Sequence, residues 1–512
     1  MLGMDETQPH QNRTDAAAEI AFPNPAASDP IGPLGPSVEP PTPVLLEPLQ
    51  PALWLPVTVL CTVLFISAVA AQYALVLLTD RDELLESPEE FLEHVTGRNL
   101  DMEEFADRRP GWEVLLDTLQ GYEPGDLLND AIEAYQDYSP KSAWLRPTRT
   151  LAVLLAEAGR LDDADGELML LEDEESESDF VAAFRFAYGE EVPDSPPPPL
   201  DRVATMVHPP WARDRLLLRI AEKKEDRSTA DAAHARLDSR SQKLRNQSAP
   251  LIFGPALVMA ASILILIGWA GFGFPSTELG VGHTVSLWSV GRGASVMVRA
   301  ALAGLVLQAL VAYTLLDEFR FLHGFMSLIG ILPLLWFGSY FLLRPWGLTL
   351  SSCFGFFVPL RRWGGLLLFT IALAGIDGIG TIGITALTEY LGIHMHWAES
   401  PEESFLWDPA WVVGLNFMDG VVWAPIFEEI GCRGFLYTTI RRWLPTTPAA
   451  LATGVLFGAA HLYSLQGFLV VAWSGFLWSL AYEKSRSLLP GIFSHSLGNV
   501  LAFGGMILVY RV

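Results

Sequence analysis

Polar side chains at helical spacing interrupt the apolar sequence near the end of this 512-residue chain. Glu429 and Arg433 are four residues apart, so on a helix they share one face and can form an ion pair. Glu428 points about 100° away from Glu429 and is therefore free of that arginine. His495 and Asn499 have the same spacing, which places an imidazole and an amide on one face of a second helix.

A third apolar segment contains His461 directly after a Gly-Ala-Ala run, whose small side chains let another helix approach closely. Ionisable residues inside membrane spans are expensive and are functional candidates by default. One free carboxylate, two imidazoles and one amide on three helices suffice for hydrolysis by an activated water. Glu428 would take a proton from this water, and donors on the other helices would bind the developing oxyanion.

Each motif also has a purely structural interpretation. Glu429 and Arg433 can be only a buried ion pair, and the histidines can be only helix-packing groups. A single motif favours that interpretation, whereas three motifs together in one membrane bundle favour a catalytic site.

Other polar residues are left outside the predicted site. His394, His396 and Glu399 resemble a small ligand set, but they lie between spans, which favours a solvated loop. Asp377 and Asp419 fall within spans, where their glycine neighbours indicate packing positions as readily as cavity-lining ones.

The composition indicates that membrane helices position these motifs. Half of the residues are hydrophobic, only 18% are charged, and the mean hydropathy is +0.30. These values exclude an ordinary soluble enzyme, a disordered protein and a disulfide-rich secreted protein. Nine stretches approach the roughly 20 apolar residues that cross a bilayer. They lie at residues 54–78, 251–272, 296–316, 321–343, 366–387, 409–427, 448–464, 467–482 and 488–510.

The acidic charge of the chain is concentrated between the first two spans. Residues 81–250 contain 20 basic and 38 acidic side chains, a net charge of −18, whereas residues 251–512 have a net charge of −1. This balance excludes nucleic acid as a partner, because phosphate binding needs a basic surface. The segment 150–171 predicts two helices broken at Gly159, with a turn similar to that of a tetratricopeptide (TPR) repeat. A weaker copy begins 34 residues earlier, at Gly125. An unrelated helical bundle is the open alternative.

We therefore predict an all-α, polytopic helical membrane protein of about nine spans with a helical, TPR-like soluble insert that binds a protein partner. The ten prolines of residues 1–50 predict a disordered tail. The remaining predicted domains are a first transmembrane anchor (51–80), the acidic insert (81–249), accessory transmembrane helices (250–345) and a catalytic core (346–512). Lysine and arginine in the short loops, among them Arg362, Arg442 and Arg486, place one side of the core in the cytoplasm and the insert on the other side. The juxtamembrane cluster of Arg240, Lys243 and Arg245 favours the opposite placement of the insert, which stays open.

The three motifs together resemble those of the CPBP family, the CAAX-protease and bacteriocin-processing intramembrane proteases, also called Abi. The family pattern is two adjacent glutamates, three residues and an arginine, then Phe-x-x-x-His, then His-x-x-x-Asn. The resemblance covers about residues 340–510. The chain matches the pattern at Glu428, Glu429, Arg433, Phe457, His461, His495 and Asn499.

The resemblance implies an active site within the bilayer that hydrolyses peptide bonds of a peptide or membrane-protein substrate. It implies that Glu428 activates water with help from His461, and that His495 and Asn499 stabilise the oxyanion. The cofactor question stays open between a metal-free glutamate mechanism and a divalent metal such as zinc, which Glu428, His461 and His495 would hold.

The predicted catalytic set consists of six residues: Glu428, Glu429, Arg433, His461, His495 and Asn499. We expect an integral protein of the bacterial inner membrane. The alternative function is a non-catalytic membrane scaffold or bacteriocin-immunity protein whose insert binds a partner. A transporter is disfavoured, because the spans show no inverted repeat.

Overall fold

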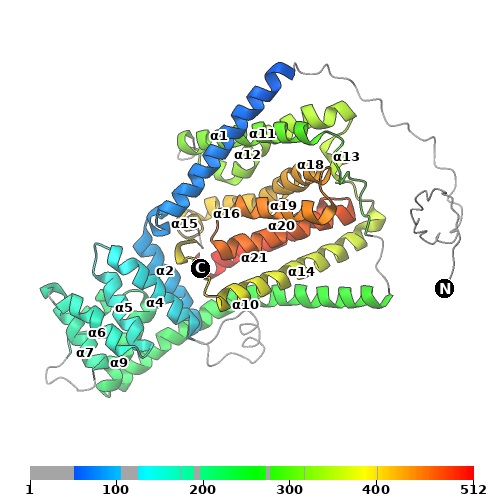
Figure 1. The fold of residues 1–512 in the computed structure, drawn as a ribbon. Helices are drawn as coiled ribbons and strands as arrows, with labels where there is room; N and C mark the ends of the chain where they lie inside the picture. Colours follow the sequence, from blue (N-terminus) through cyan, green and yellow to red (C-terminus); the bar gives the residue numbers. More distant parts are fainter. Residues whose placement is uncertain are drawn as a thin grey trace, which may run out of the picture. The chain divides into compact units, whose positions relative to one another are not determined.

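The computed structural model describes residues 51–104, 125–172, 174–189, 197–272, 277–315, 318–399 and 402–511. Helices connected by turns and loops make up these residues, and no strand occurs among them (Figure 1). The predicted all-α class is therefore confirmed. The tail predicted at residues 1–50 lies outside the described ranges.

Eight helical stretches of the described chain are long and apolar enough to cross a membrane. They are Leu55–Val76, Arg227–Phe272, Val290–Thr314, Arg320–Trp346, Leu360–Tyr390, Ala410–Arg441, Leu465–Ser485 and Leu489–Arg511. The stretch predicted at 448–464 forms the shorter helix α19, Thr446–Ala459. Its 14 residues extend about 21 Å, less than the roughly 30 Å of a bilayer's hydrocarbon core.

Small residues let the helices around the polar motifs pack closely. Helix α20 (Leu465–Ser485) lies along α19, and α14 (Trp363–Tyr390) and α21 (Leu489–Met506) lie beside it (Figure 1). A Cβ atom added at Gly454 of α19 would lie 2.6 Å from the carbonyl oxygen of Ala472 in α20. A larger residue at Gly454 would therefore force these two helices apart.

The sixth long stretch changes its helical pitch twice where the glutamates lie. It begins as α16 (Ala410–Met418), continues through the π-helical segment Asp419–Trp423 into α17 (Ala424–Glu429), and ends through a second π-helical segment, Ile430–Tyr437, in α18 (Thr438–Arg441). π-Helical turns widen a helix and are frequent at functional sites. Glu428 and Glu429 are the last residues before the second one.

The insert consists of short helices around one apolar core. They are α2 (Pro88–Glu103), α4 (Asp126–Tyr138), α5 (Arg146–Glu157), α6 (Leu161–Glu172), α7 (Ser178–Tyr188), α8 (Leu200–Met206) and α9 (Pro210–Lys223). The predicted break at Gly159 is present: its φ of 75° ends α5, and Arg160 N donates to Leu155 O at 2.9 Å. This is a Schellman ending, which needs a glycine-like conformation. The similarity to TPR repeats stays a prediction.

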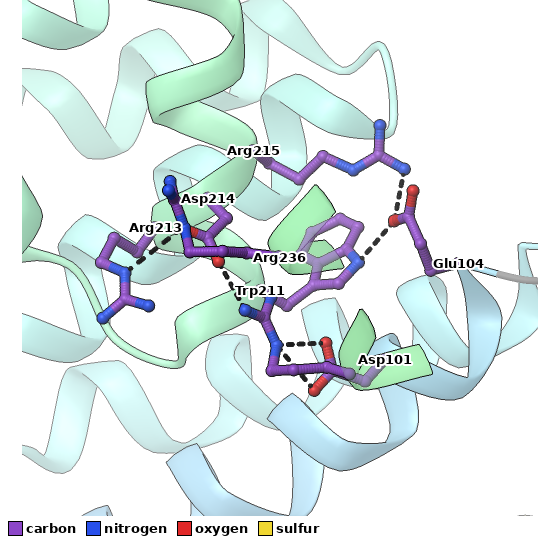
Figure 2. Close-up of polar contacts among 8 residues, drawn as sticks. Asp101, Glu104, Trp211, Arg213, Asp214, Arg215 and Arg236 are labelled. Carbon is purple, nitrogen blue, oxygen red and sulfur yellow. Dashed lines mark hydrogen bonds and ion pairs between the residues drawn. The ribbon is translucent and has the colours of Figure 1, made fainter. Parts of the chain in front are cut away.

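The helix α10 (Arg227–Phe272) joins the insert to the membrane part without a break, and it runs through the boundary predicted at residues 249–250. Charged residues bind its first half to the insert. Arg240 of α10 donates to Asp101 of α2 at 3.0 Å and to Asp214 of α9 at 2.5 Å, and Arg236 also donates to Asp214. Figure 2 shows these carboxylates among their arginines, with Glu104 accepting bonds from the neighbouring α9 side chains.

The insert also contacts the membrane part through Trp397, in a short 3-10 helix (Trp397–Glu399) after α14. Its ring lies 6.3 Å from Phe91 of α2 and 5.9 Å from Tyr138 of α4. Glu403 accepts two backbone N–H bonds at the start of α2, where a helix dipole favours negative charge. The insert is therefore docked onto the membrane part and is not only tethered to it.

Three of the predicted cytoplasmic loop arginines contact one connecting segment, residues 278–286. Arg362 donates to Glu278 O and Arg442 donates to Ser286 O, each at 2.8 Å, and Arg486 donates to Gly282 O at 3.2 Å. These loops therefore meet at one end of the bundle. The side of the membrane on which they lie stays a prediction.

Candidate active site

The Glu429–Arg433 pair is present and lies in the interior of the protein. Arg433 Nη1 donates to Glu429 Oε1 at 2.7 Å, and both side chains are at most 1% exposed. Arg433 Nη2 donates to the Gly475 carbonyl of α20 at 3.0 Å. Its guanidinium also lies 4.4 Å from the ring centroid of Phe457 and 5.1 Å from that of Trp478. The pair therefore joins three helices at one point.

His495 of α21 lies between the two glutamates. Its Nδ1 is 3.5 Å from Glu429 Oε1, and its Nε2 is 3.8 Å from Glu428 Oε2. Trp478 of α20 stacks on the imidazole, with ring centroids 4.2 Å apart and planes 23° apart. The first and third motifs therefore meet at His495, whose ring plane is fixed by this stacking.

His461 lies in a turn just beyond the end of α19, and not inside a membrane helix as its place in the stretch 448–464 predicted. Its Nδ1 is 2.8 Å from the Phe457 carbonyl oxygen. A carbonyl only accepts, so Nδ1 bears the proton and Nε2 of the neutral ring is left as an acceptor. The Phe457 ring lies 4.8 Å from the ring of His461 and 5.9 Å from that of His495. The second motif thus joins the other two through Phe457.

Glu428 differs from Glu429 in its surroundings. The Glu428 side chain is 35% exposed, against 1% for Glu429. Glu428 Oε2 is nevertheless shielded, and no hydrogen-bond donor of the described residues reaches it. Water or a substrate can therefore reach the exposed part of the Glu428 side chain, while Oε2 faces the His495 ring.

Asn499 is engaged with a neighbouring backbone group. Its Nδ2 donates to the Gly420 carbonyl, in the first π-helical segment, at 2.7 Å. One N–H of the amide is used by this bond and the other is left for an oxyanion. The bond also fixes the side of α21 on which the amide lies.

Two residues near the site were not predicted from the sequence. Trp478 stacks on His495, but a tryptophan in a membrane helix gives no signal of such a role. Asp377 of α14, left outside the predicted site, accepts from Ser474 at 2.7 Å and interacts electrostatically with Arg433 and His495. Its charge inside a span was the signal that could have included it.

The predicted metal-ligand set does not assemble. In the described part of the chain, no group of three or more His, Cys, Asp or Glu side chains has a geometry that could hold a metal ion. Glu428 and His495 lie 3.8 Å apart, whereas His461 contacts the carbonyl and the ring of Phe457. In this arrangement the three side chains do not form a zinc ligand set, and the choice between a metal-free and a metal-dependent mechanism stays a prediction.

The loop set of His394, His396 and Glu399 also separates. His394 contacts Glu389, and His396 lies 3.6 Å from Asp137 of the insert. The Glu399 side chain is only 2% exposed, so the interpretation of a solvated loop is wrong for this residue.

Comparison with known proteins finds a family match over the segment of the chain that contains the three motifs. Residues 409–501 match the family model of the type II CAAX prenyl endopeptidases, Rce1-like. This range contains all seven motif residues, so the predicted resemblance to CAAX proteases is confirmed over it. The match points to a CAAX-type membrane endopeptidase, and the eight long apolar helices point to an integral membrane protein. No match was found among curated proteins or among solved structures.

Proposed function

We propose that the protein is a membrane-embedded endopeptidase that cleaves a peptide or a membrane-protein substrate with a water activated by Glu428. The observation that carries this proposal is the position of His495, within 3.8 Å of Glu428 and 3.5 Å of Glu429 and stacked on Trp478. Three motifs that are distant in the sequence contribute to this one cluster. A scaffold protein has no need for such a cluster.

In the proposed reaction Glu428 accepts a proton from water while the water oxygen attacks the scissile carbonyl carbon. The Nε2 acceptor of His461 assists this transfer. The oxyanion that forms is bound by His495, whose Nε2 faces Glu428, and by the second amide N–H of Asn499. The proton then passes to the leaving amine nitrogen as the peptide bond breaks.

Glu429 and Arg433 act indirectly in this scheme, by positioning other residues. Their ion pair fixes the end of α17 against α20 and α21, and so fixes where Glu428 and His495 lie. We propose the bacterial inner membrane as the location, and a protein partner or the substrate itself as the ligand of the acidic insert.

Cleavage of a peptide panel by the purified full-length protein tests the proposal. The panel contains peptides ending in a CAAX sequence, with and without a prenyl group, and unrelated peptides. We expect cleavage by the wild-type protein, in the presence and in the absence of a chelator, and loss of cleavage in Glu428→Gln. A wild-type protein that cleaves nothing, or a fully active Glu428→Gln, would contradict the proposed function.

A further inference from the structure

The turn that contains His461 is held by residues that are distant from it in the sequence. Helix α19 ends at Ala459 and α20 begins at Leu465. Between them Leu462 has a φ of 57°, in the left-handed region that side chains other than glycine rarely adopt. Such a conformation persists only when the surrounding structure stabilises it.

Arg81 and Glu399 contact the residues that follow His461 in the sequence. Arg81 Nη2 donates to the Leu462 carbonyl at 3.4 Å, and Glu399 accepts the backbone N–H of Ser464. The two side chains form an ion pair of 3.0 Å, in which Arg81 is 22% and Glu399 2% exposed. Because this pair is largely shielded from water, it is screened less than a surface pair.

Tyr73 contacts a residue that precedes His461 in the sequence. This residue of α1 (Pro51–Leu78) donates its hydroxyl to the carbonyl of Ala459, two residues before His461. Tyr73 belongs to the first anchor and Arg81 to the start of the insert, before α2, and with Glu399 they lie outside the residues 409–501 that match the endopeptidase family. The segment that carries the imidazole is thus held from both ends by parts of the chain that the family match does not include.

Glu399 also connects this turn to the insert. Glu399 is the last residue of the 3-10 helix that begins at Trp397, and Trp397 packs on Phe91 and Tyr138 of the insert. A change in the docking of the insert would therefore reach Glu399 through one turn of helix. From Glu399 it would reach Ser464, three residues after His461.

We propose that Arg81 and Glu399 are positioning residues for His461, and that through them the first anchor and the docked insert orient the catalytic imidazole. This inference rests on the proposed peptidase function. Neither side chain touches reacting atoms. They act through the peptide groups of Leu462 and Ser464, and so they affect the rate of the chemical step and not the affinity for substrate.

The first test compares turnover of the full-length protein in one detergent, with a peptide that the wild type cleaves. We expect Arg81→Gln and Glu399→Gln to lower kcat by about 10–100-fold, because a small misplacement of a catalytic group has effects of this size. KM should stay within about twofold, and Arg81→Lys should recover part of the rate. The control is Arg320→Gln, which removes the ion pair with Asp408 and has no described contact with the turn.

A double-mutant cycle distinguishes positioning from general stabilisation. If Arg81 acts through His461, then Arg81→Gln has no further effect on the residual turnover of His461→Ala. Losses that multiply in the double mutant would show that Arg81 acts elsewhere and would overturn the inference.

Hydrogen exchange gives a measurement that does not depend on activity. The amides of residues 460–464 should exchange faster in Arg81→Gln and in Glu399→Gln, while those in the middle of α20 keep the wild-type rate. Unchanged exchange of the turn, or full activity of both variants beside an active wild type, overturns this inference alone. A wild-type protein that cleaves no peptide overturns the proposed function, and this inference with it.

Discussion

The insert and the membrane part use ion pairs in different ways. In the insert, Arg240 bonds both Asp101 and Asp214, and Asp214 also contacts Arg236 and Arg213 (Figure 2). In the membrane part, Glu429 is the one carboxylate of the described residues at ion-pair distance from Arg433, while Asp377 interacts with this arginine without an ion pair. Arg240 therefore keeps one carboxylate at ion-pair distance when it loses the other, and Arg433 does not.

Access to water explains this difference. Arg240 and Arg236 are 24% and 44% exposed, whereas Arg433 and Glu429 are at most 1% exposed. A surface charge that loses its partner is solvated, but a buried charge is left uncompensated. The partly exposed arginines of the insert are thus expected to tolerate the loss of a partner. For the bundle we propose a specific role for each glutamate, catalysis for Glu428 and structure for Glu429.

The largest expected effect concerns catalysis by Glu428. Glu428→Gln keeps the shape of the side chain and removes the base, so we expect turnover to fall by roughly 10²–10⁴-fold. Because Glu428 contacts no cation of the described chain more closely than His495 at 3.8 Å, the melting temperature should change little. Turnover and melting temperature are measured together, with Glu278→Gln, whose side chain is exposed, as the matched control. An early-melting Glu428→Gln would show that this carboxylate has a structural role.

Glu429→Gln should lower the stability of the protein as well as its activity. It leaves Arg433 as a buried charge without its carboxylate partner, which lowers the free energy of unfolding by about 3–5 kcal/mol. Low yield and a lowered melting temperature should accompany the loss of activity. The neighbouring Glu428→Gln in the same detergent is the control. A stable but inactive Glu429→Gln would reverse the two roles.

The part of this site that could be predicted follows from helical periodicity. Residues four apart on one helix are neighbours whatever surrounds them, which is why the Glu429–Arg433 pair could be predicted without a structure. Apolar length likewise located the membrane helices. Periodicity does not determine which helices pack together, so the stacking of Trp478 on His495 could not be predicted.

The end of α19 could not be predicted from the sequence either. Apolar residues continue past Ala459, and the turn after His461 contains no glycine or proline that would mark it. Leu462 adopts the left-handed conformation because contacts from outside the turn hold it there. The burial of Glu399 has the same origin, since its partner Arg81 is more than 300 residues away in the sequence, at the start of the insert.

Within the insert, Asp214→Asn tests the tolerance that the comparison predicts. Asp214 is fully buried and accepts from Arg236 at 2.9 Å and Arg240 at 2.5 Å. We expect the free energy of unfolding of the insert to fall by about 1.5–3 kcal/mol, the usual contribution of hydrogen bonds to charged groups. The loss should be smaller than for Glu429→Gln, because Arg240 keeps Asp101. Hydrogen exchange of α9 amides measures it, with the exposed Asp231→Asn as control. If Asp214→Asn lowers the free energy of unfolding as much as Glu429→Gln does, the proposed difference between the two regions is wrong.

The smallest expected effect is a pH dependence of the insert that arises from Glu93 of α2. Burial raises the pKa of this carboxyl to about 7, against the opposing effect of Arg146, whose Nη1 lies 3.5 Å from Glu93 Oε1. Between the ordinary pKa of 4.5 and about 7, the folded insert binds more protons than the unfolded chain, so its stability falls as the pH rises through this window.

The measurement is the exchange rate of α2 amides between pH 5 and pH 8, corrected for the intrinsic effect of pH on exchange. Burial raises the pKa of Glu89 and Asp101 as well, so the wild type contains their contributions of the same sign. The informative quantity is therefore the difference between wild type and Glu93→Gln, which should be less dependent on pH and more stable at pH 8, by on the order of 1 kcal/mol. Glu83→Gln, at an exposed position before the same helix, should keep the wild-type slope. Equal slopes for wild type and Glu93→Gln would contradict the raised pKa of Glu93 and would show that its pairing with Arg146 outweighs its burial.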